Sequence, residues 1–401
     1  MKKLVTFLLL VTTAITVAQD IKVTTKDNDL KLAALPYYSY GKGLGITSPD
    51  SLFQLNIRFR MQNRVTFIQN EDEDAAYSGE IRRLRLRFDG YVGNPHFLYV
   101  IQLSFAPGDV GEIQDGENIN IIRDAAVFYR PNKHWSFLFG QTKLPGNRQR
   151  VNSSGALQLT DRSINNARFT IDRDFGFQAY YLNENKDKFS YNVKTAVSTG
   201  EGRNWTKSAD DGVALTGKLE LMPFGSFKND GTNFEGDVAR EKTPKLLLSG
   251  AFHQNNLARR TQGQLGNDLF EQKTMKSVLL DAMLKYNGWA LMSSYAKDPI
   301  AFNPDDITEF NYVPVGSGMD YQLSYVFPTN YEIIGRFSTQ NMHDDIKALT
   351  PDSKQYSLGV TKYLWEHAFK LQGEVTLSDL NYFDGSNKQN WYVRFQLEIG
   401  I

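Results

Sequence analysis

The sequence of 401 residues has no cysteine, only five histidines and no excess of charge of either sign. Without cysteine, the chain forms no disulfide, no thiolate nucleophile and no cysteine metal site. The histidines are scattered, which argues against a histidine-rich metal site. The 45 basic and 45 acidic residues cancel, so the chain has no general attraction to nucleic acid.

Catalytic motifs are also missing. The chain contains no G-x-S-x-G, no H-E-x-x-H and no P-loop pattern. A lipase-type barrel needs a serine close to a histidine, and the spacing around His134 and His367 shows no such partner. We therefore expect a protein that is not an enzyme and that needs no metal or cofactor.

The first residues have the pattern of an export signal. Lys2 and Lys3 precede an apolar run over 4–11, and small or β-branched residues lead to Ala18. This pattern predicts a signal peptide over residues 1–18, followed by an N-terminal periplasmic segment over residues 19–51. No later stretch is apolar for long enough to span a bilayer as a helix. A chain of this kind can cross a membrane only as a closed β-barrel.

Aromatic residues and strict alternation are what the sequence has in excess. It contains 26 Phe, 20 Tyr and 5 Trp. Over residues 53–62, apolar side chains take the odd positions and polar side chains the even ones, and residues 391–399 repeat the pattern. A period of two places the two sets on opposite faces of a β-strand.

Segments with this alternation recur along the whole chain. They lie near 52–67, 81–92, 96–106, 121–130, 134–143, 175–183, 188–199, 212–222, 244–254, 276–286, 289–297, 317–327, 330–340, 354–363, 368–378 and 390–401. A strand of about 11 residues tilted by about 45° rises roughly 25 Å, the height of the apolar band of an outer-membrane barrel. The predicted fold is all-β: one transmembrane antiparallel β-barrel of about 16 strands over residues 52–401.

The connections alternate between short turns and long polar stretches. Short periplasmic turns and long external loops are typical of outer-membrane barrels. Residues 223–243 break this rule, because a long stretch stands where a short periplasmic turn is expected. Either that turn is elaborated or the strand count is wrong there. A secreted β-sandwich is the alternative architecture, but it leaves the alternation of connection lengths unexplained.

Six arginines lie on the polar face of the first two predicted strands. They are Arg58, Arg60, Arg64, Arg83, Arg85 and Arg87. In a barrel they face the lumen as a ladder of fixed positive charge, which suits the transfer of anions between weak sites. Two alternatives stay open at this point: a weakly selective pore, and arginines that only pair with acidic residues such as Asp89 and Asp124.

The longest external loop, residues 144–174, is a candidate constriction. In and beside it lie the charged residues Lys143, Arg148, Arg150, Asp161 and Arg162. Such a loop either folds into the lumen and narrows the bore or only caps its mouth. The acidic run 71–74 lacks the spaced ligands and glycine of a calcium loop, so we expect a solvated external loop there.

Several motifs resemble the phosphate-selective porin O and P family. They are Gly41-Lys42-Gly43-Leu44-Gly45-Ile46, Arg82-Arg83-Leu84-Arg85-Leu86-Arg87, Arg123-Asp124-Ala125, Gly140-Gln141-Thr142-Lys143-Leu144-Pro145, Thr160-Asp161-Arg162-Ser163, Arg173-Asp174-Phe175-Gly176 and Met222-Pro223-Phe224-Gly225. Their order and spacing, from about residue 40 to the end, carry the resemblance. The signal end Val17-Ala18-Gln19 looks like that of a member from the Bacteroidota.

The resemblance implies a sixteen-stranded outer-membrane barrel, commonly trimeric, with its third loop folded inside. It implies that anions pass an arginine ladder and a set of constriction lysines. The ladder role transfers to the arginines of the first two predicted strands. At the constriction, Lys143 is present, but loop 144–174 carries arginine and aspartate instead of further lysines.

The expected function is an outer-membrane porin for passive diffusion of small solutes, with a preference for anions and with phosphate as a candidate solute. Its expected partners are outer-membrane lipid and lipopolysaccharide, small anions or polar solutes, and copies of itself or a larger complex. The alternative is a non-conducting barrel that serves as a structural or assembly subunit of a larger complex. Its lumen would then be plugged by loop 144–174 or by residues 19–36.

Overall fold

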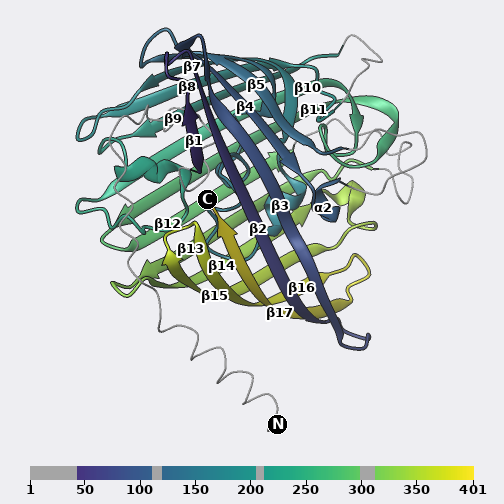
Figure 1. Cartoon of the computed structure of the whole chain (residues 1–401). Helices are drawn as coiled ribbons and strands as arrows, with labels where there is room; N and C mark the ends of the chain where they lie inside the picture. The colour runs from purple at the N-terminus through teal and green to yellow at the C-terminus, as the bar shows by residue number, and fades with distance from the viewer. Residues whose placement is uncertain (1–42, 111–119, 205–211, 299–311) are drawn as a thin grey trace. The chain divides into compact units, whose positions relative to one another are not determined.

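The computed structural model describes residues 43–110, 120–204, 212–298 and 312–401. Sixteen antiparallel strands form a closed barrel (Figure 1). They are β2 (Phe53–Gln69), β3 (Ala76–Val92), β4 (Asn94–Ser104), β5 (Ile122–Tyr129), β6 (Trp135–Lys143), β7 (Arg173–Asn183), β8 (Ser190–Ser198), β9 (Ala214–Met222), β10 (Lys245–Arg260), β11 (Asp268–Tyr286), β12 (Trp289–Asp298), β13 (Gly316–Val326), β14 (Tyr331–Met342), β15 (Asp352–Trp365), β16 (Phe369–Asn381) and β17 (Asn387–Gly400). The predicted signal peptide lies outside the described residues.

Every one of the sixteen predicted segments is a strand, so the predicted fold is confirmed. Several strands extend further toward the long loops than predicted; β11, for example, begins at Asp268 rather than near residue 276. Alternation marks only the part of a strand that has lipid on one face and the lumen on the other. Beyond the lipid both faces meet water, so the pattern fades while the hydrogen-bond ladder continues.

A short additional strand, β1 (Leu44–Thr47), completes the edge of β2. The last strand, β17, pairs with β2 only from Arg60 onward, and β1 pairs with β2 from Gln54 to Ile57. The backbone of Ile401 donates a hydrogen bond to Phe59 O at 3.1 Å, between these two pairings. An uncovered edge would leave backbone donors and acceptors without partners. The end of the segment 19–51 therefore belongs to the sheet.

The two faces of the wall differ as the parity predicts. On β15, Leu358 and Val360 are exposed on the outer face, whereas Ser357 and Thr361 are buried toward the lumen. Aromatic side chains form contacting pairs near both ends of the outer face. Pairs near the short turns include Phe97–Tyr129 and Trp289–Tyr325, and pairs near the long loops include Phe67–Trp391 and Phe337–Tyr356. Two aromatic girdles around an apolar band are the signature of a barrel seated in an outer membrane.

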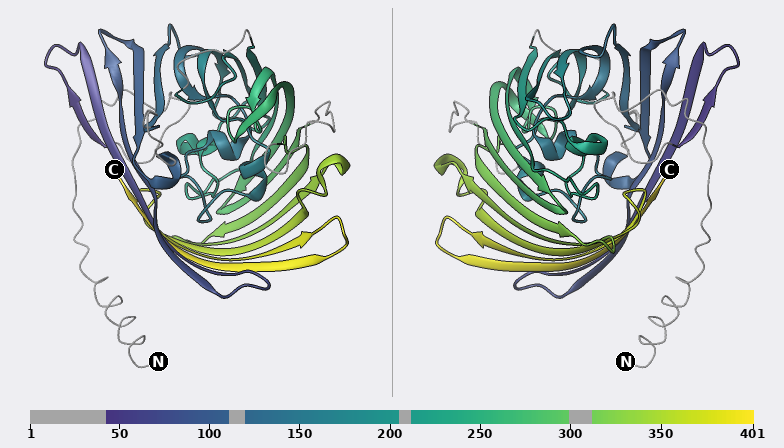
Figure 2. Two further views of the ribbon diagram at one scale, coloured as in Figure 1. Left: turned by 90° about the vertical axis from the view of Figure 1, so that its right-hand side faces the viewer. Right: turned by 90° about the vertical axis from the view of Figure 1, so that its left-hand side faces the viewer.

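Two of the connections lie inside the ring of strands (Figure 2). One joins β6 to β7 and contains the short helices α3 (Arg148–Val151) and α4 (Ile164–Arg168); it is called the β6–β7 loop below. The other is the β9–β10 connection, with a 3₁₀ segment η2 (Lys228–Asn233). The stretch 223–243 is therefore an elaborated turn, and the strand count stands. Two further helical turns in the described ranges are α2 (Pro107–Val110) and η4 (Asp344–Ile346).

No helix in the described parts of the chain is long and apolar enough to cross a membrane.

The lipid-facing role of the outer wall can be tested with a single introduced charge. We expect Val360→Arg, in the middle of the outer face of β15, to lower the free energy of unfolding by about 2–4 kcal/mol. Asn381→Arg, on the outer face at the rim of β16, should cost about 0–1 kcal/mol. Both values can be measured by guanidinium titration of the protein folded into lipid vesicles. Equal costs at the two positions would show that the face is not in lipid.

Candidate pore site: an arginine wall and two inserted segments

Two neighbouring strands, β2 and β3, bring seven arginines to one side of the lumen. We call Arg58, Arg60, Arg64, Arg82, Arg83, Arg85 and Arg87 the arginine wall; it includes all six predicted pore-lining residues. In the register of the two strands, Arg58 lies opposite Arg87 and Arg60 lies opposite Arg85. Like charges directly opposite each other destabilise a sheet. The wall therefore depends on acidic partners.

Carboxylates placed between the arginines supply this compensation. Asp89 on β3 lies 3.3 Å from Arg58 Nη2 and 3.0 Å from Arg87 Nε. Asp109 in α2 lies 2.7 Å from Arg85 Nη2. Hydrogen bonds between guanidinium and carboxylate are the strong, charge-assisted kind. Asp89 serves two guanidinium groups at once, so this part of the wall has more positive than negative groups.

A cluster of three ion pairs joins the arginine wall to the β6–β7 loop. Asp161 of that loop lies 3.1 Å from Arg64, 2.8 Å from Arg82 and 3.0 Å from Arg83. Burial by itself would raise the pKa of the Asp161 carboxyl, but Arg83, Arg82 and Arg64 outweigh it and hold this pKa well below its usual range. Asp161 is therefore ionised in the folded protein and links the loop to the wall.

Arg82 and Arg123 also lie on the lumen side, and both lie at irregularities of the ladder. The register of β2 with β3 slips at Arg82, and that of β4 with β5 slips at Arg123. A β-bulge adds one residue to a strand and re-aims a side chain. Arg82 therefore joins Arg83 on the lumen side, and Arg123 lies 2.9 Å from Asp109. The only hint in the sequence was adjacent charge, in Arg82-Arg83 and Arg123-Asp124.

On β16 and β13, further around the barrel, the same loop donates hydrogen bonds to carboxylates. Glu374 on β16 accepts from the backbone N of Thr160 at 2.9 Å and from its Oγ1 at 2.6 Å. Asp320 on β13 accepts from Ser163 Oγ at 2.8 Å. The loop presents a carboxylate to the arginines and presents N–H and O–H donors to the acids. The β6–β7 loop therefore links the arginines of β2 and β3 to the acids of β16 and β13.

Two predicted constriction residues donate hydrogen bonds to the backbone of the β6–β7 loop. Lys143 Nζ donates to the carbonyl oxygens of Val151 at 2.8 Å and Asn152 at 2.9 Å. Arg162 Nη2 also donates to Asn152 O, at 3.0 Å. Both cations therefore hold the turn after α3 in place. Of the predicted constriction residues, Asp161 is the one that contacts the arginine wall.

The other two, Arg148 and Arg150, lie at α3. The backbone N of Arg148 donates to Asp281 on β11 at 3.0 Å. Arg150 Nη2 lies 2.7 Å from Asp172, near the end of the loop. These contacts hold α3 against β11 and against the end of the β6–β7 loop.

Apolar contacts complete the anchoring of the loop. Leu144, Phe169 and Ile171 form a buried cluster with Leu279 and Met342. The last two residues belong to the inward faces of β11 and β14, which in an open lumen would meet water. Burying a side chain of this size contributes about 1.5–3 kcal/mol. Apolar residues at these inward positions are consistent with a loop that stays inserted.

The β9–β10 connection forms a second inserted segment. Lys285 on β11 donates hydrogen bonds to three of its carbonyl oxygens: Gly231 at 2.8 Å, Phe234 at 2.9 Å and Gly236 at 2.7 Å. Phe227 of the connection packs in a second inward apolar cluster with residues of β9–β12. The sequence signalled this segment only by its length. Its inward fold was not predicted.

The two inserted segments touch inside the barrel. The backbone N of Gln158, in the β6–β7 loop, donates to Glu235 in the connection at 3.1 Å. The backbone N of Glu235 donates to Ala156 O at 3.4 Å, and Gln322 on β13 donates to the Glu235 carboxylate at 3.2 Å. A loop from the long-loop end and a connection from the short-turn end therefore meet across the lumen.

Comparison with known families agrees with this architecture. Residues 53–238 match the family model "Phosphate-selective porin O and P". This region is similar to the porin O and P family. The resemblance predicted from the sequence is confirmed over residues 53–238. The comparison with curated proteins yields no match.

Solved structures of outer-membrane channels share the fold. The channel DcaP of Acinetobacter baumannii is 15% identical, with a TM-score of 0.55 over 89% of this chain and 99% of that one. An anion-selective porin from Comamonas acidovorans is 12% identical, with a TM-score of 0.53 over 86% and 100% of the chains. OmpF of Salmonella typhi, in complex with daunomycin, is 12% identical, with a TM-score of 0.54 over 89% and 100%.

The family match and the fold together indicate an outer-membrane channel for small solutes rather than an enzyme. Among the residues that the structure describes, no three His, Asp or Glu side chains gather as a metal site.

The link through Asp161 can be tested with Asp161→Asn. Loss of the carboxylate should leave Arg82 and Arg83 without this partner, leave Arg64 with Glu80, and loosen the loop. We therefore expect higher single-channel conductance and a stronger preference for anions. Asp74→Asn, at an exposed position between β2 and β3, is the matched control and should behave as wild type. Unchanged current in Asp161→Asn would contradict the link.

The depressed pKa of Asp161 predicts how this link depends on pH. A carboxyl whose pKa is lowered by folding contributes stability above the unfolded pKa, and this contribution is lost as the pH falls through the folded pKa. The difference in conductance between wild type and Asp161→Asn should therefore stay constant from pH 8 down to about pH 4. Bilayer recordings across this range would show a shrinking difference if the carboxyl titrated normally.

Proposed function

We propose that the chain is a porin for passive diffusion of small solutes that prefers anions, with inorganic phosphate among the candidate solutes. The observation that carries this proposal is the ratio of arginines to carboxylates on the arginine wall. Asp161 faces three arginines, and Asp89 and Asp109 face two each. Glu80 beside Arg64 and Glu398 beside Arg60 bring the carboxylates to five, so the seven arginines of the wall still outnumber them.

The arrangement suits stepwise transfer of an anion. Successive inward side chains of a strand lie roughly 7 Å apart. A guanidinium group stays charged at all relevant pH values and binds carboxylate or phosphate oxygens through two parallel hydrogen bonds. Because each arginine is already shared with a carboxylate, an entering anion competes with that carboxylate. This competition keeps each site weak enough to release the solute.

A non-conducting assembly subunit is the less favoured reading. Holding charges away from water is costly unless each is paired and fully hydrogen-bonded. A barrel that only fills space would gain nothing from an excess of arginine over carboxylate on one wall. The family match also favours a channel. The homotrimer that the resemblance implies stays a prediction, which cross-linking in native membranes can test.

Ion selectivity in a planar bilayer tests the proposal. We expect the anion-to-cation permeability ratio of wild type to exceed one and to fall several-fold in Arg83→Ala/Arg85→Ala, because two fixed charges are removed. Lys362→Ala, on the outer face of β15, is the control and should leave the ratio unchanged. A heat-modifiable, folded barrel that never conducts would overturn the channel function. A conducting channel whose permeability ratio is the same in wild type and in Arg83→Ala/Arg85→Ala would overturn only the anion preference.

The β9–β10 connection should contribute to the narrowest passage. We expect Lys285→Met to raise single-channel conductance, because three hydrogen bonds that hold the connection are lost. Lys276→Met, exposed on the outer face of the same strand, is the control. Permeation of neutral sugars of increasing size gives a second readout. Identical exclusion limits in wild type and Lys285→Met would show that the connection does not narrow the pore.

A further inference from the structure

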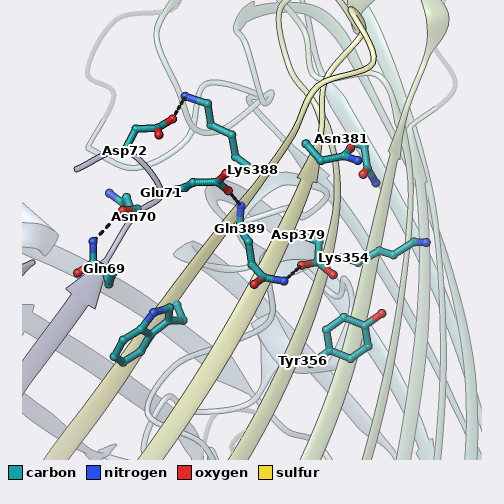
Figure 3. A pocket seen from close by; sticks show the side chains of 12 residues that line it. Gln69, Asn70, Glu71, Asp72, Lys354, Tyr356, Asp379, Asn381, Lys388 and Gln389 are labelled. Carbon is teal, nitrogen blue, oxygen red and sulfur yellow. Dashed lines mark hydrogen bonds and ion pairs between the residues drawn. The ribbon is translucent and has the colours of Figure 1, made fainter. Parts of the chain in front are cut away.

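A polar groove lies on the outside of the barrel, beside the long loops. Its volume is about 750 Å³, and it is formed by β2, β15, β16 and β17 (Figure 3). The groove is lined by Gln69, Asn70, Glu71, Asp72, Lys354, Tyr356, Asp379, Asn381, Asn387, Lys388, Gln389 and Trp391. The arginine wall and the inserted segments take no part in it.

The lining side chains point away from the lumen. Lys354 and Tyr356 are exposed, whereas their neighbours Gln355 and Ser357 are buried toward the lumen. Lys354 pairs in register with Asp379, so these two side chains share the outer face. The groove therefore belongs to the outer surface of the barrel and not to the pore.

The groove is continuous with the lipid-facing band below it. Trp391, at its lower border, contacts Phe67 with ring centroids 5.2 Å apart. Tyr356 contacts Phe337 at 5.0 Å in the same aromatic girdle. Directly below on β15, Leu358 is 56% exposed on the outer face. Tyrosine and tryptophan mark the level at which acyl chains give way to headgroups. The polar groove therefore lies at the height of the outer-leaflet headgroups.

The chemistry of the groove suits a phosphorylated saccharide. Lys354 has no hydrogen-bond or ion-pair partner among the described residues, so its ammonium is available to a phosphate. Asp379 accepts from Gln389 Nε2 at 2.9 Å and keeps further acceptor capacity for sugar hydroxyls. The amides of Asn381 and Asn387 add both donors and acceptors. Such a mixture of groups matches a headgroup that carries many hydroxyls and a few phosphates.

We propose that this groove binds the phosphorylated saccharide headgroup of an outer-leaflet lipopolysaccharide. The acyl chains lie along the apolar band beneath Tyr356 and Trp391, and the saccharide occupies the groove above them. Lys354 binds a phosphate, and Asp379 binds sugar hydroxyls. The proposal does not depend on whether the pore conducts.

Native mass spectrometry of the detergent-solubilised, folded barrel tests this site. The probes are rough-type lipopolysaccharide, its fully deacylated oligosaccharide and phosphatidylethanolamine. The variants are Lys354→Gln and Asp379→Asn. Lys362→Gln is the matched control, since it lies on the same outer face of β15 near the short-turn end, where its Nζ bonds Thr329 O. Heat-modifiability on gels confirms that each variant is folded.

The site predicts that lipopolysaccharide stays bound to wild type and to Lys362→Gln, and binds about fivefold more weakly to Lys354→Gln, as expected for one lysine at a membrane surface. Asp379→Asn should also weaken binding. Equal retention of phosphatidylethanolamine would overturn the headgroup specificity. Equal affinity for the deacylated oligosaccharide would overturn the membrane source of the ligand. Equal loss in Lys362→Gln would overturn the location.

Discussion

Every backbone N–H and C=O of the spanning strands needs a partner within the sheet, because lipid supplies none. This constraint closes the ladder between β17 and β2 and between β9 and β10. It also accounts for β1, which pairs with the part of β2 that β17 does not reach. Once the ladder is closed, side chains alternate between lipid and lumen. The apolar band, the aromatic girdles and the charged interior all follow from that alternation.

In the lumen, unlike on the lipid-facing outer surface, charged side chains are tolerated if each finds a partner. The arginine wall is an example. Cross-strand arginine pairs would repel each other without Asp89, Asp109 and Asp161 between them. Two of these carboxylates come from outside the spanning strands, in α2 and the β6–β7 loop. The stability of the arginine wall therefore depends on the position of the β6–β7 loop.

Filling the lumen from both ends has a structural consequence. The β6–β7 loop and the β9–β10 connection cover inward apolar residues that water would otherwise contact, and they join at Glu235. Two segments far apart in sequence therefore meet inside the barrel.

The sequence by itself determined the strands, because lipid on one face and water on the other impose a period of two on every spanning segment. It also determined which six arginines face the lumen, since parity holds within a regular strand. The sequence did not predict that Arg82 and Arg123 face the lumen, because a bulge changes parity without changing composition. The partners of Asp161 and Glu235, and the inward fold of the β9–β10 connection, were decided only by the tertiary structure. A loop carries no periodic signal, and its position depends on the walls that surround it.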